Sequence, residues 1–204
     1  MTRKLGSAIV MLSVLWAVTS LALKGGIGLT QADAQVTFCV EPVTNQTDVF
    51  SLGYYNLGPA LGPVSDNTMN IVNPGTTGES TCANIYVFDS NQNMLACCSC
   101  PVSPNGLLTL SVKNNLLNGS IKVKSGVIEV VPSFEFDPSP VCSASASYCY
   151  GSELVGWLAH GSGSISTEVE LKHAPLSLDQ LGSLQTGCGA TGVHACSCPA
   201  GTLP

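Results

Sequence analysis

Ten cysteines are the strongest constraint on what this 204-residue chain can fold into, and all ten follow an apolar N-terminal segment. They are Cys39, Cys82, Cys97, Cys98, Cys100, Cys142, Cys149, Cys188, Cys196 and Cys198. An even number of cysteines in an exported chain favours disulfides over free thiols. The sequence therefore predicts a disulfide-stapled protein, although the pairing scheme stays open.

Spacing limits the pairing in three places. Cys97 and Cys98 are adjacent, so in an extended strand they point to opposite faces and need different partners. Cys142 and Cys149 flank a short loop, which predicts a local bridge. Cys188, Cys196 and Cys198 are expected to fasten the C-terminal tail to the body, and each bridge stabilises by about 2–4 kcal/mol.

A metal site is the alternative use of two of these clusters. Cys97-Cys98-Ser99-Cys100 and His194-Ala195-Cys196-Ser197-Cys198 together offer thiolates and an imidazole, which suit copper(I) or zinc. Paired C-x-x-C knuckles and a C-x-x-C-H haem attachment sequence are both missing from the sequence. We therefore expect disulfides, with no metal and no cofactor.

Residues 1–34 have the layout of a secretory signal. Arg3 and Lys4 precede an uncharged, mostly apolar run, and Ala32-Asp33-Ala34 gives a small-x-small cleavage pattern that places the mature start at Gln35. The alternative is an uncleaved anchor, since about 20 apolar residues can span a bilayer. Glycine, serine and threonine dilute the run, so we expect cleavage, secretion to the cell surface and no membrane contact afterwards.

The mature chain carries very little positive charge. Without residues 1–34 it keeps 170 residues, with four lysines, no arginine and 12 acidic residues, a net charge of −8. Nucleic-acid binding depends on Lys and Arg to neutralise phosphates, so it is excluded. A surface rich in hydroxyls and amides but poor in charge suits adhesion and assembly.

The strand signals predict a mainly β fold. Strict alternation at 165–172, with Ile165, Thr167, Val169 and Leu171 on one face, predicts a half-buried strand. Residues 84–89 are apolar on both faces, which indicates a central strand. Further strands are expected at 108–112 and at 154–160.

Two local motifs give finer predictions. Residues 120–131 fit a hairpin turning at Ser125-Gly126, in which Lys122 would face Glu129. Ser177 and Gln180 have capping-box spacing before Leu178, Leu181 and Leu184, which predicts a short helix ending near Gly187.

These signals together predict a disulfide-stapled antiparallel β-sandwich with one short C-terminal helix. We expect three parts: a signal peptide at 1–34, a polar N-terminal arm at 35–80 with one or two strands, and the sandwich domain with its cysteine-rich tail at 81–204.

No catalytic motif emerges from the sequence. His160-Gly161-Ser162-Gly163-Ser164 is not a G-x-S-x-G elbow, and a turn is the simpler interpretation. The carboxylate pairs Glu168/Glu170 and Glu135/Asp137 have glycosidase-like separation but fit a solvated face. Residues 89–93 could hold calcium, although a polar turn suits them better. We therefore expect no enzyme and no catalytic residue.

Aromatic side chains are the candidate ligand-binding groups. Tyr54, Tyr55, Tyr148 and Tyr150 could stack on sugars, whereas Trp157 lies in an apolar run and is expected in the core. Asn45 and Asn118 begin N-glycosylation sequons.

One stretch supports a family resemblance. Residues 82–89, in the pattern C-A-x-I-Y-V-F-D, and the later C-C-x-C-P element at 97–101 resemble a group of secreted, cysteine-rich bacterial proteins of acidobacterial type. The resemblance covers about residues 70–190. It implies bacterial export and brings no activity with it.

We therefore expect a secreted, non-enzymatic structural protein of the cell surface, with self-assembly into an extracellular filament as one form of this role. Copies would join through the N-terminal arm or through sheet edges. The alternative is a secreted polysaccharide-binding module. A hydrolase using His160 or Glu168 is the remaining option.

Overall fold

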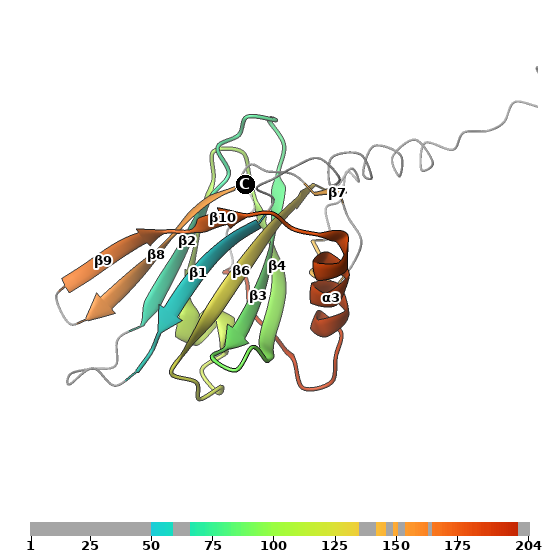
Figure 1. Ribbon diagram of the computed structural model, residues 1–204. Helices are drawn as coiled ribbons and strands as arrows, with labels where there is room; N and C mark the ends of the chain where they lie inside the picture. Colours follow the sequence, from blue (N-terminus) through green and yellow to red (C-terminus); the bar gives the residue numbers. More distant parts are fainter. Residues whose placement is uncertain are drawn as a thin grey trace, which may run out of the picture. The chain divides into compact units, whose positions relative to one another are not determined.

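Two β-sheets packed face to face, with one helix against the outside of the larger sheet, make up the described part of the protein (Figure 1). The computed structural model describes residues 50–58, 66–134, 142–145, 149–150, 154–162 and 165–199, which belong to one compact unit, Phe38–Pro204. The expected signal peptide, Cys39, Asn45, Glu135, Asp137 and Tyr148 lie outside the described residues.

The larger sheet, sheet A, has the strand order β10-β1-β6-β3-β4-β11, with β7 paired to β6. Its strands are β1 (Phe50–Asn56), β3 (Thr81–Asp89), β4 (Met94–Val102), β6 (Ser125–Phe134), β7 (Cys149–Tyr150), β10 (Lys172–Ala174) and β11 (His194–Ala195). The smaller sheet, sheet B, has the order β5-β2-β8-β9. Its strands are β2 (Asn67–Val72), β5 (Leu107–Ser111), β8 (Val155–Ser162) and β9 (Ile165–Glu170).

The main core lies between the sheets. Sheet A contributes alternate residues of β3, β4 and β6, and sheet B contributes Met69, Ile71, Leu108, Leu110 and Leu158. The alternation predicted for residues 108–112 is confirmed, since Leu108, Leu110 and Val112 are all fully buried. Val112 begins a single π-type helical turn, η1 (Val112–Leu116), whose N-terminus is capped by the Ser111 side chain.

Strand β3 is central, as its two apolar faces predict. It pairs with β6 on one side and β4 on the other, and its first seven residues are buried. One face packs into the main core through Ala83, Ile85 and Val87. The other carries Tyr86 into a second apolar cluster beneath the helix, so sheet A is covered on both sides.

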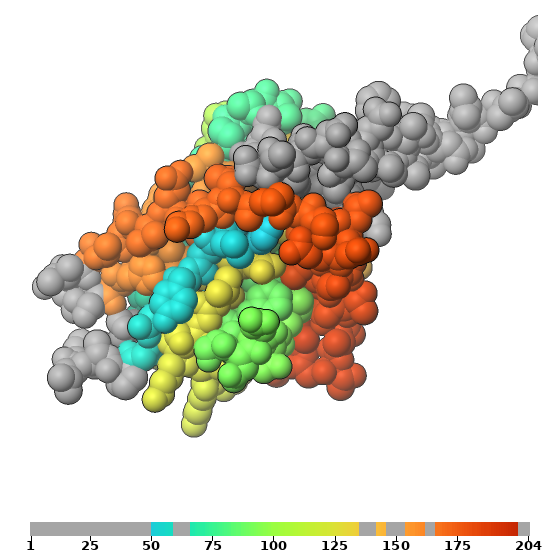
Figure 2. Space-filling model, in the orientation of Figure 1, coloured from blue at the N-terminus to red at the C-terminus, as the bar shows by residue number. Residues whose placement is uncertain are grey.

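The predicted helix is confirmed as α3 (Leu178–Cys188). Ser177 and Gln180 form both hydrogen bonds of the capping box, and Leu181 and Leu184 are buried against sheet A. Leu178 is exposed instead, and the helix ends at Cys188, next to the expected Gly187, with Gly189 as its C-cap. Figure 2 shows α3 along one side of this face, with strands of sheet A visible beside it.

The expected boundary at residue 80 is wrong. Strand β1 pairs with both β6 and β10, and β2 pairs with both β5 and β8. Residues from the segment assigned to a polar arm therefore supply inner strands of both sheets. Tyr55, Met69 and Ile71 carry the apolar contacts that place them there.

The hairpin expected at 120–131 does not form. Ser125 and Gly126 begin strand β6, which pairs with β1 and β3 rather than with residues 120–124. Glu129 lies opposite Leu52 and Tyr86, and not opposite Lys122. Gly126 is needed for close packing: a β-carbon there would lie 1.8 Å from the Phe88 carbonyl oxygen.

Two expectations about burial in sheet B are also wrong. Strand β9 is an edge strand, and Thr167 and Val169 are exposed although they face the core side; only Leu171 is buried. Trp157 is half-buried on the outer face of sheet B, in register with Asn70 and Glu170. In Figure 1, the end of β8 and the start of β9 project beyond the strands of sheet A.

Candidate functional site

The described cysteines form four disulfides, and three of them join strand β4 to the C-terminal segment. The pairs are Cys82–Cys142, Cys97–Cys188, Cys98–Cys196 and Cys100–Cys198. Among the described residues no cysteine is free. Disulfides of this number fit an oxidising environment.

Two of the three pairing expectations are confirmed. Cys97 and Cys98 have different partners, and the tail cysteines are fastened to the body. The local bridge between Cys142 and Cys149 is wrong, because Cys142 joins Cys82 across 60 residues of sequence. Cys82 lies on the same face of β3 as Tyr86, whose hydroxyl donates to the carbonyl oxygen of Ala144, two residues from Cys142, at 2.8 Å.

The bridges Cys98–Cys196 and Cys100–Cys198 lie side by side, and we call them the cysteine ladder. Strand β11 runs parallel to β4, with His194 beside Ala96 and Ala195 beside Cys97. The backbone N–H of Cys196 donates to the Cys97 carbonyl oxygen at 3.1 Å, which continues this register. Cys98-Ser99-Cys100 therefore lies along Cys196-Ser197-Cys198, two identical tripeptides in parallel.

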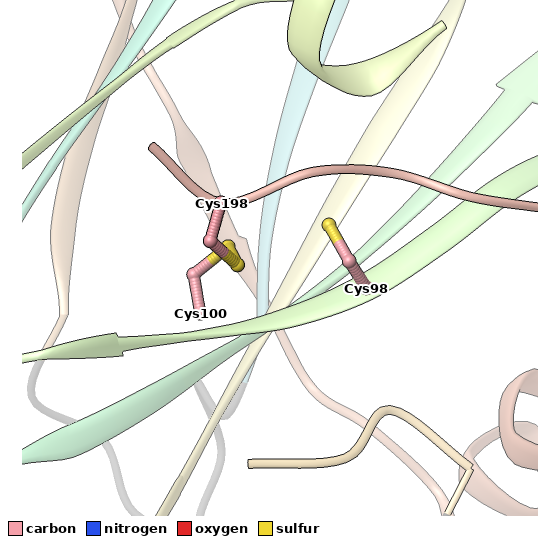
Figure 3. Close-up of side chains that lie close together, drawn as sticks. All are labelled: Cys98, Cys100 and Cys198. Carbon is pink, nitrogen blue, oxygen red and sulfur yellow. A yellow bond between two sulfur atoms is a disulfide. The ribbon is translucent and has the colours of Figure 1, made fainter. Parts of the chain in front are cut away.

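The ladder is compact and faces the main core. The sulfur atoms of Cys98, Cys100 and Cys198 all lie within 4.8 Å of one another (Figure 3). Cys100 is fully buried, whereas Cys98, Cys196 and Cys198 are half-buried against the core. The metal interpretation was right that the two cysteine clusters meet. In this oxidised form, however, the sulfurs are bonded in disulfides and are not thiolate ligands.

Tyr54 and Tyr55 do not form one platform, and the side chains of Tyr148 and Tyr150 lie outside the described part of the structure. Tyr55 is fully buried and its hydroxyl donates to the Phe88 carbonyl oxygen at 3.0 Å, whereas Tyr54 is 55% exposed on the opposite face of β1. Burial, with a smaller effect from the Asp89 charge, raises the pKa of Tyr55 well above its usual range. Tyr55 is therefore a core residue, and of this pair only Tyr54 is open to a ligand.

A mixed polar and apolar surface that the sequence did not reveal lies on the outer face of sheet B. Cross-strand register sets Thr109, Asn70, Trp157 and Glu170 in one row, and the Thr109 hydroxyl donates to the Asn70 side-chain oxygen at 2.9 Å. The next row holds Leu107, Val72 and Val155; Leu107 is 57% and Val155 44% exposed. The surface thus combines an indole, an amide, a hydroxyl and a carboxylate.

The sheet edges differ in their protection. On sheet A, β4 is covered by β11 and the disulfide-bonded tail. On sheet B, edge strand β9 carries the exposed carboxylates Glu168 and Glu170. The other edge strand of sheet B, β5, has the uncharged sequence Leu-Leu-Thr-Leu-Ser, and no described strand pairs beyond it.

An apolar groove of about 390 Å³ opens where β9 and β1 diverge. Leu52, Gly53 and Tyr54 line its sheet A side, and His160 and Val169 line its sheet B side. Glu168 lies beside Ala159 rather than His160 across the β8–β9 pair. The groove brings His160 together with Glu170 and Lys172, and its described lining contains no serine, threonine or cysteine.

The acidic loop at 89–93 is the polar turn that was preferred over a calcium site. The Asp89 carboxylate accepts hydrogen bonds from the backbone N–H groups of Asn91 (2.8 Å) and Asn93 (2.9 Å), and from the Asn93 side chain (3.1 Å). These bonds, those from Asn93 foremost, lower the pKa of Asp89. The carboxylate thus accepts three hydrogen bonds within the turn that joins β3 to β4.

Comparison with known proteins adds little. No protein-family model and no curated protein matches the chain. Among solved structures, the crystal structure of Thermotoga maritima 1070 covers 65% of this chain and 99% of its own at 16% identity and a TM-score of 0.41. The Anabaena sensory rhodopsin transducer covers 43% and 86% at 18% identity and a TM-score of 0.31. Likenesses this weak carry no argument about function.

Proposed function

We propose that the protein is a secreted, non-enzymatic structural protein of the bacterial cell surface whose copies assemble, as filament subunits, through an open strand edge. The observation that carries the proposal is the uneven protection of the edges: β5 is uncharged and open, whereas β4 is covered and β9 is charged. Edge strands that lack charges, proline and cover are templates for pairing with another chain. The disulfides and the signal-like residues 1–34 support export. None of the helices in the described residues is long and apolar enough to cross a membrane.

The residue pattern of β5 suits pairing with a second copy of itself. Leu108 and Leu110 face the core and Thr109 faces outward. The pairing register between two copies can therefore change only in steps of two residues, because a one-residue shift would turn the leucines outward. In an antiparallel pair centred on Thr109, Leu108 meets Leu110 of the second copy, and Thr109 meets Thr109. Such a pair would continue sheet B across both copies without placing like charges opposite each other.

A lysine in the centre of β5 tests this contact. Thr109→Lys would bring two positive charges together at the centre of the pair, whereas Thr167→Lys places the same change on edge strand β9. The mature, oxidised protein is examined by negative-stain electron microscopy and by analytical ultracentrifugation. We expect assemblies from wild type and Thr167→Lys, and their loss in Thr109→Lys. Equal assembly by all three would refute the β5 contact, and discrete small particles of wild type would refute the structural role.

Pairing at β5 alone yields only two-fold pairs, so a filament needs a second contact, which we assign to residues 35–48. Deleting 35–60 cannot test this, because it would remove strand β1. Deletion of 35–48 spares β1. It removes Cys39, so the deletion also carries Cys149→Ser to keep an even number of cysteines. The control is Cys39→Ser with Cys149→Ser in the complete mature chain. Filaments from the control but only pairs from the deletion would support the assignment, and filaments from both would overturn it.

The outer face of sheet B supports a second candidate function, polysaccharide binding. Sugar rings stack on indole faces, while amides, hydroxyls and carboxylates exchange hydrogen bonds with sugar hydroxyls. Trp157, Asn70 and Glu170 lie in one cross-strand row there. Retention of the protein on insoluble glycans should then fall in Trp157→Ala and persist in Tyr54→Ala. Equal retention in both variants would argue against this surface.

A further inference from the structure

We propose that reduction converts the cysteine ladder into a binding site for one soft metal ion, of the class of Zn²⁺ or Cu⁺, with Cys98, Cys100, Cys196 and Cys198 as ligands. The disulfide form and the metal form would then be two exclusive states of one site. This inference goes beyond assembly and does not depend on it.

Three of the four sulfurs already lie close enough together to share one metal ion. A Zn–S bond of about 2.3 Å places neighbouring sulfurs of a tetrahedral site about 3.8 Å apart. The sulfurs of Cys98, Cys100 and Cys198 all lie within 4.8 Å of one another, so small side-chain rotations would close the distance. Cys196 supplies the fourth sulfur, since it is bonded to Cys98 and lies two residues from Cys198.

The backbone would hold the four cysteines in place after their bridges open. Strands β11 and β4 are paired, and the backbone N–H of Cys196 donates to Cys97 while that of Ser197 donates to the Asn115 carbonyl oxygen at 2.9 Å. The bridge Cys97–Cys188 lies on the other face of β4 and fastens the same C-terminal segment independently. The backbone bonds therefore keep both tripeptides side by side when the bridges are reduced, with or without Cys97–Cys188.

The chemistry requires a dithiol reductant. Each ladder disulfide takes two electrons and two protons from one dithiol, which itself becomes a disulfide, so two dithiols yield four thiols. A divalent ion then replaces up to four protons as four metal–sulfur bonds form. Soft thiolates favour Zn²⁺ and Cu⁺ over hard ions such as Mg²⁺ and Ca²⁺.

The experiment adds Zn²⁺ alone to the full mature protein, before and after treatment with dithiothreitol and removal of the reductant without oxygen. Bound zinc is measured per chain, and Co²⁺ substitution reports sulfur ligation through its charge-transfer absorption. Two double variants with equal thiol counts are compared. Cys98→Ser with Cys196→Ser removes half of the ladder, and Cys97→Ser with Cys188→Ser removes the bridge on the opposite face.

We expect no zinc in the oxidised protein and one tightly held ion in the reduced protein. Cys97→Ser with Cys188→Ser should retain that ion, and Cys98→Ser with Cys196→Ser should weaken its binding at least tenfold. Equal zinc binding by the two variants would mean that any free thiols of the chain bind zinc and that the ladder is not a specific site. That result would overturn the proposal. Absence of zinc from reduced wild type would overturn it as well.

Discussion

The hydroxyl of Ser99 donates a 2.6 Å hydrogen bond to the side-chain oxygen of Asn84, on the face of β4 opposite the cysteine ladder. The Asn84 amide donates in turn to the Val131 carbonyl oxygen at 2.9 Å and to the Ser133 hydroxyl at 2.8 Å. A single buried side chain thus connects β4, β3 and β6.

Replacing Asn84 should therefore be costly. Asn84→Ala leaves buried polar groups on both neighbouring strands without a partner, and each such group costs about 1–3 kcal/mol. We expect the free energy of unfolding, measured by urea denaturation, to fall by about 3 kcal/mol. Asn70→Ala is the control, because its side chain is only half-buried on sheet B, and it should cost under about 1 kcal/mol. Similar losses in both would contradict the role of Asn84.

Replacing either of two glycines with alanine should change the stability of the protein, in opposite directions. At Gly126 a β-carbon would meet the Phe88 carbonyl and lie 2.7 Å from the Tyr55 hydroxyl, so Gly126→Ala should destabilise by about 3 kcal/mol. At Gly182 in α3 nothing lies within 4 Å, so Gly182→Ala should stabilise by about 1 kcal/mol through helix propensity. Thermal unfolding of both variants checks this, and a stable Gly126→Ala protein would be evidence against the β6 packing.

Glu129 should make stability depend on pH. Burial raises the pKa of Glu129 in the folded protein. The stability that Glu129 contributes is therefore fully present below its pKa in the unfolded chain, about 4.3, and is lost as the pH rises through its pKa in the folded protein. Glu129→Gln should be more stable than wild type at neutral pH, with the difference disappearing in acid.

Asp89 gives the opposite test. Hydrogen bonds from Asn93 and Asn91 lower the pKa of Asp89 in the folded protein. The stability that Asp89 contributes is therefore present above its pKa in the unfolded chain and is lost as the pH falls through its pKa in the folded protein. Asp89→Asn should therefore weaken the protein at neutral pH more than in acid. Urea midpoints across the pH range measure both variants, and shifts of the same sign would contradict these assignments.

The disulfides should open in a definite order. Cys98 and Cys196 are both half-buried, whereas each of the other described bridges contains one buried partner: Cys82, Cys97 or Cys100. Access limits attack by a reducing thiolate, so Cys98–Cys196 should be reduced first. Limited reduction, alkylation and peptide mass mapping would show alkylated Cys98 and Cys196 before the others. Early alkylation of Cys82 or Cys97 would contradict this order.

Local patterns predicted local features well. The capping box predicted the start of α3, and the two apolar faces of residues 84–89 predicted the central strand β3. The adjacent positions of Cys97 and Cys98 predicted that they have different partners. Each of these depends on residues within one turn or one strand. The cysteine clusters at 97–100 and 194–198 also signalled the ladder, although spacing alone did not distinguish disulfides from metal ligands.

Features that depend on pairing between strands far apart in the sequence could not be predicted from the sequence. Ser125-Gly126 resembled a turn because only neighbouring residues were considered, whereas β6 finds its partners in β1 and β3. The exposure of Trp157 depends on which face of sheet B it occupies, and the exposure of β9 depends on its place at the edge of that sheet. Tyr54 and Tyr55 were indistinguishable until the two faces of β1 were placed.

The cross-links between β4 and the tail also determine how the protein would respond to mechanical tension. Cys98–Cys196 and Cys100–Cys198 each enclose 98 residues of sequence. A fully extended chain spans about 3.4 Å per residue, so each loop holds roughly 330 Å of contour length. A force pulling on both ends of the chain would pass through the sulfur–sulfur bonds and bypass these loops. The length held in these loops would therefore not be released under load until a reductant opened the bridges.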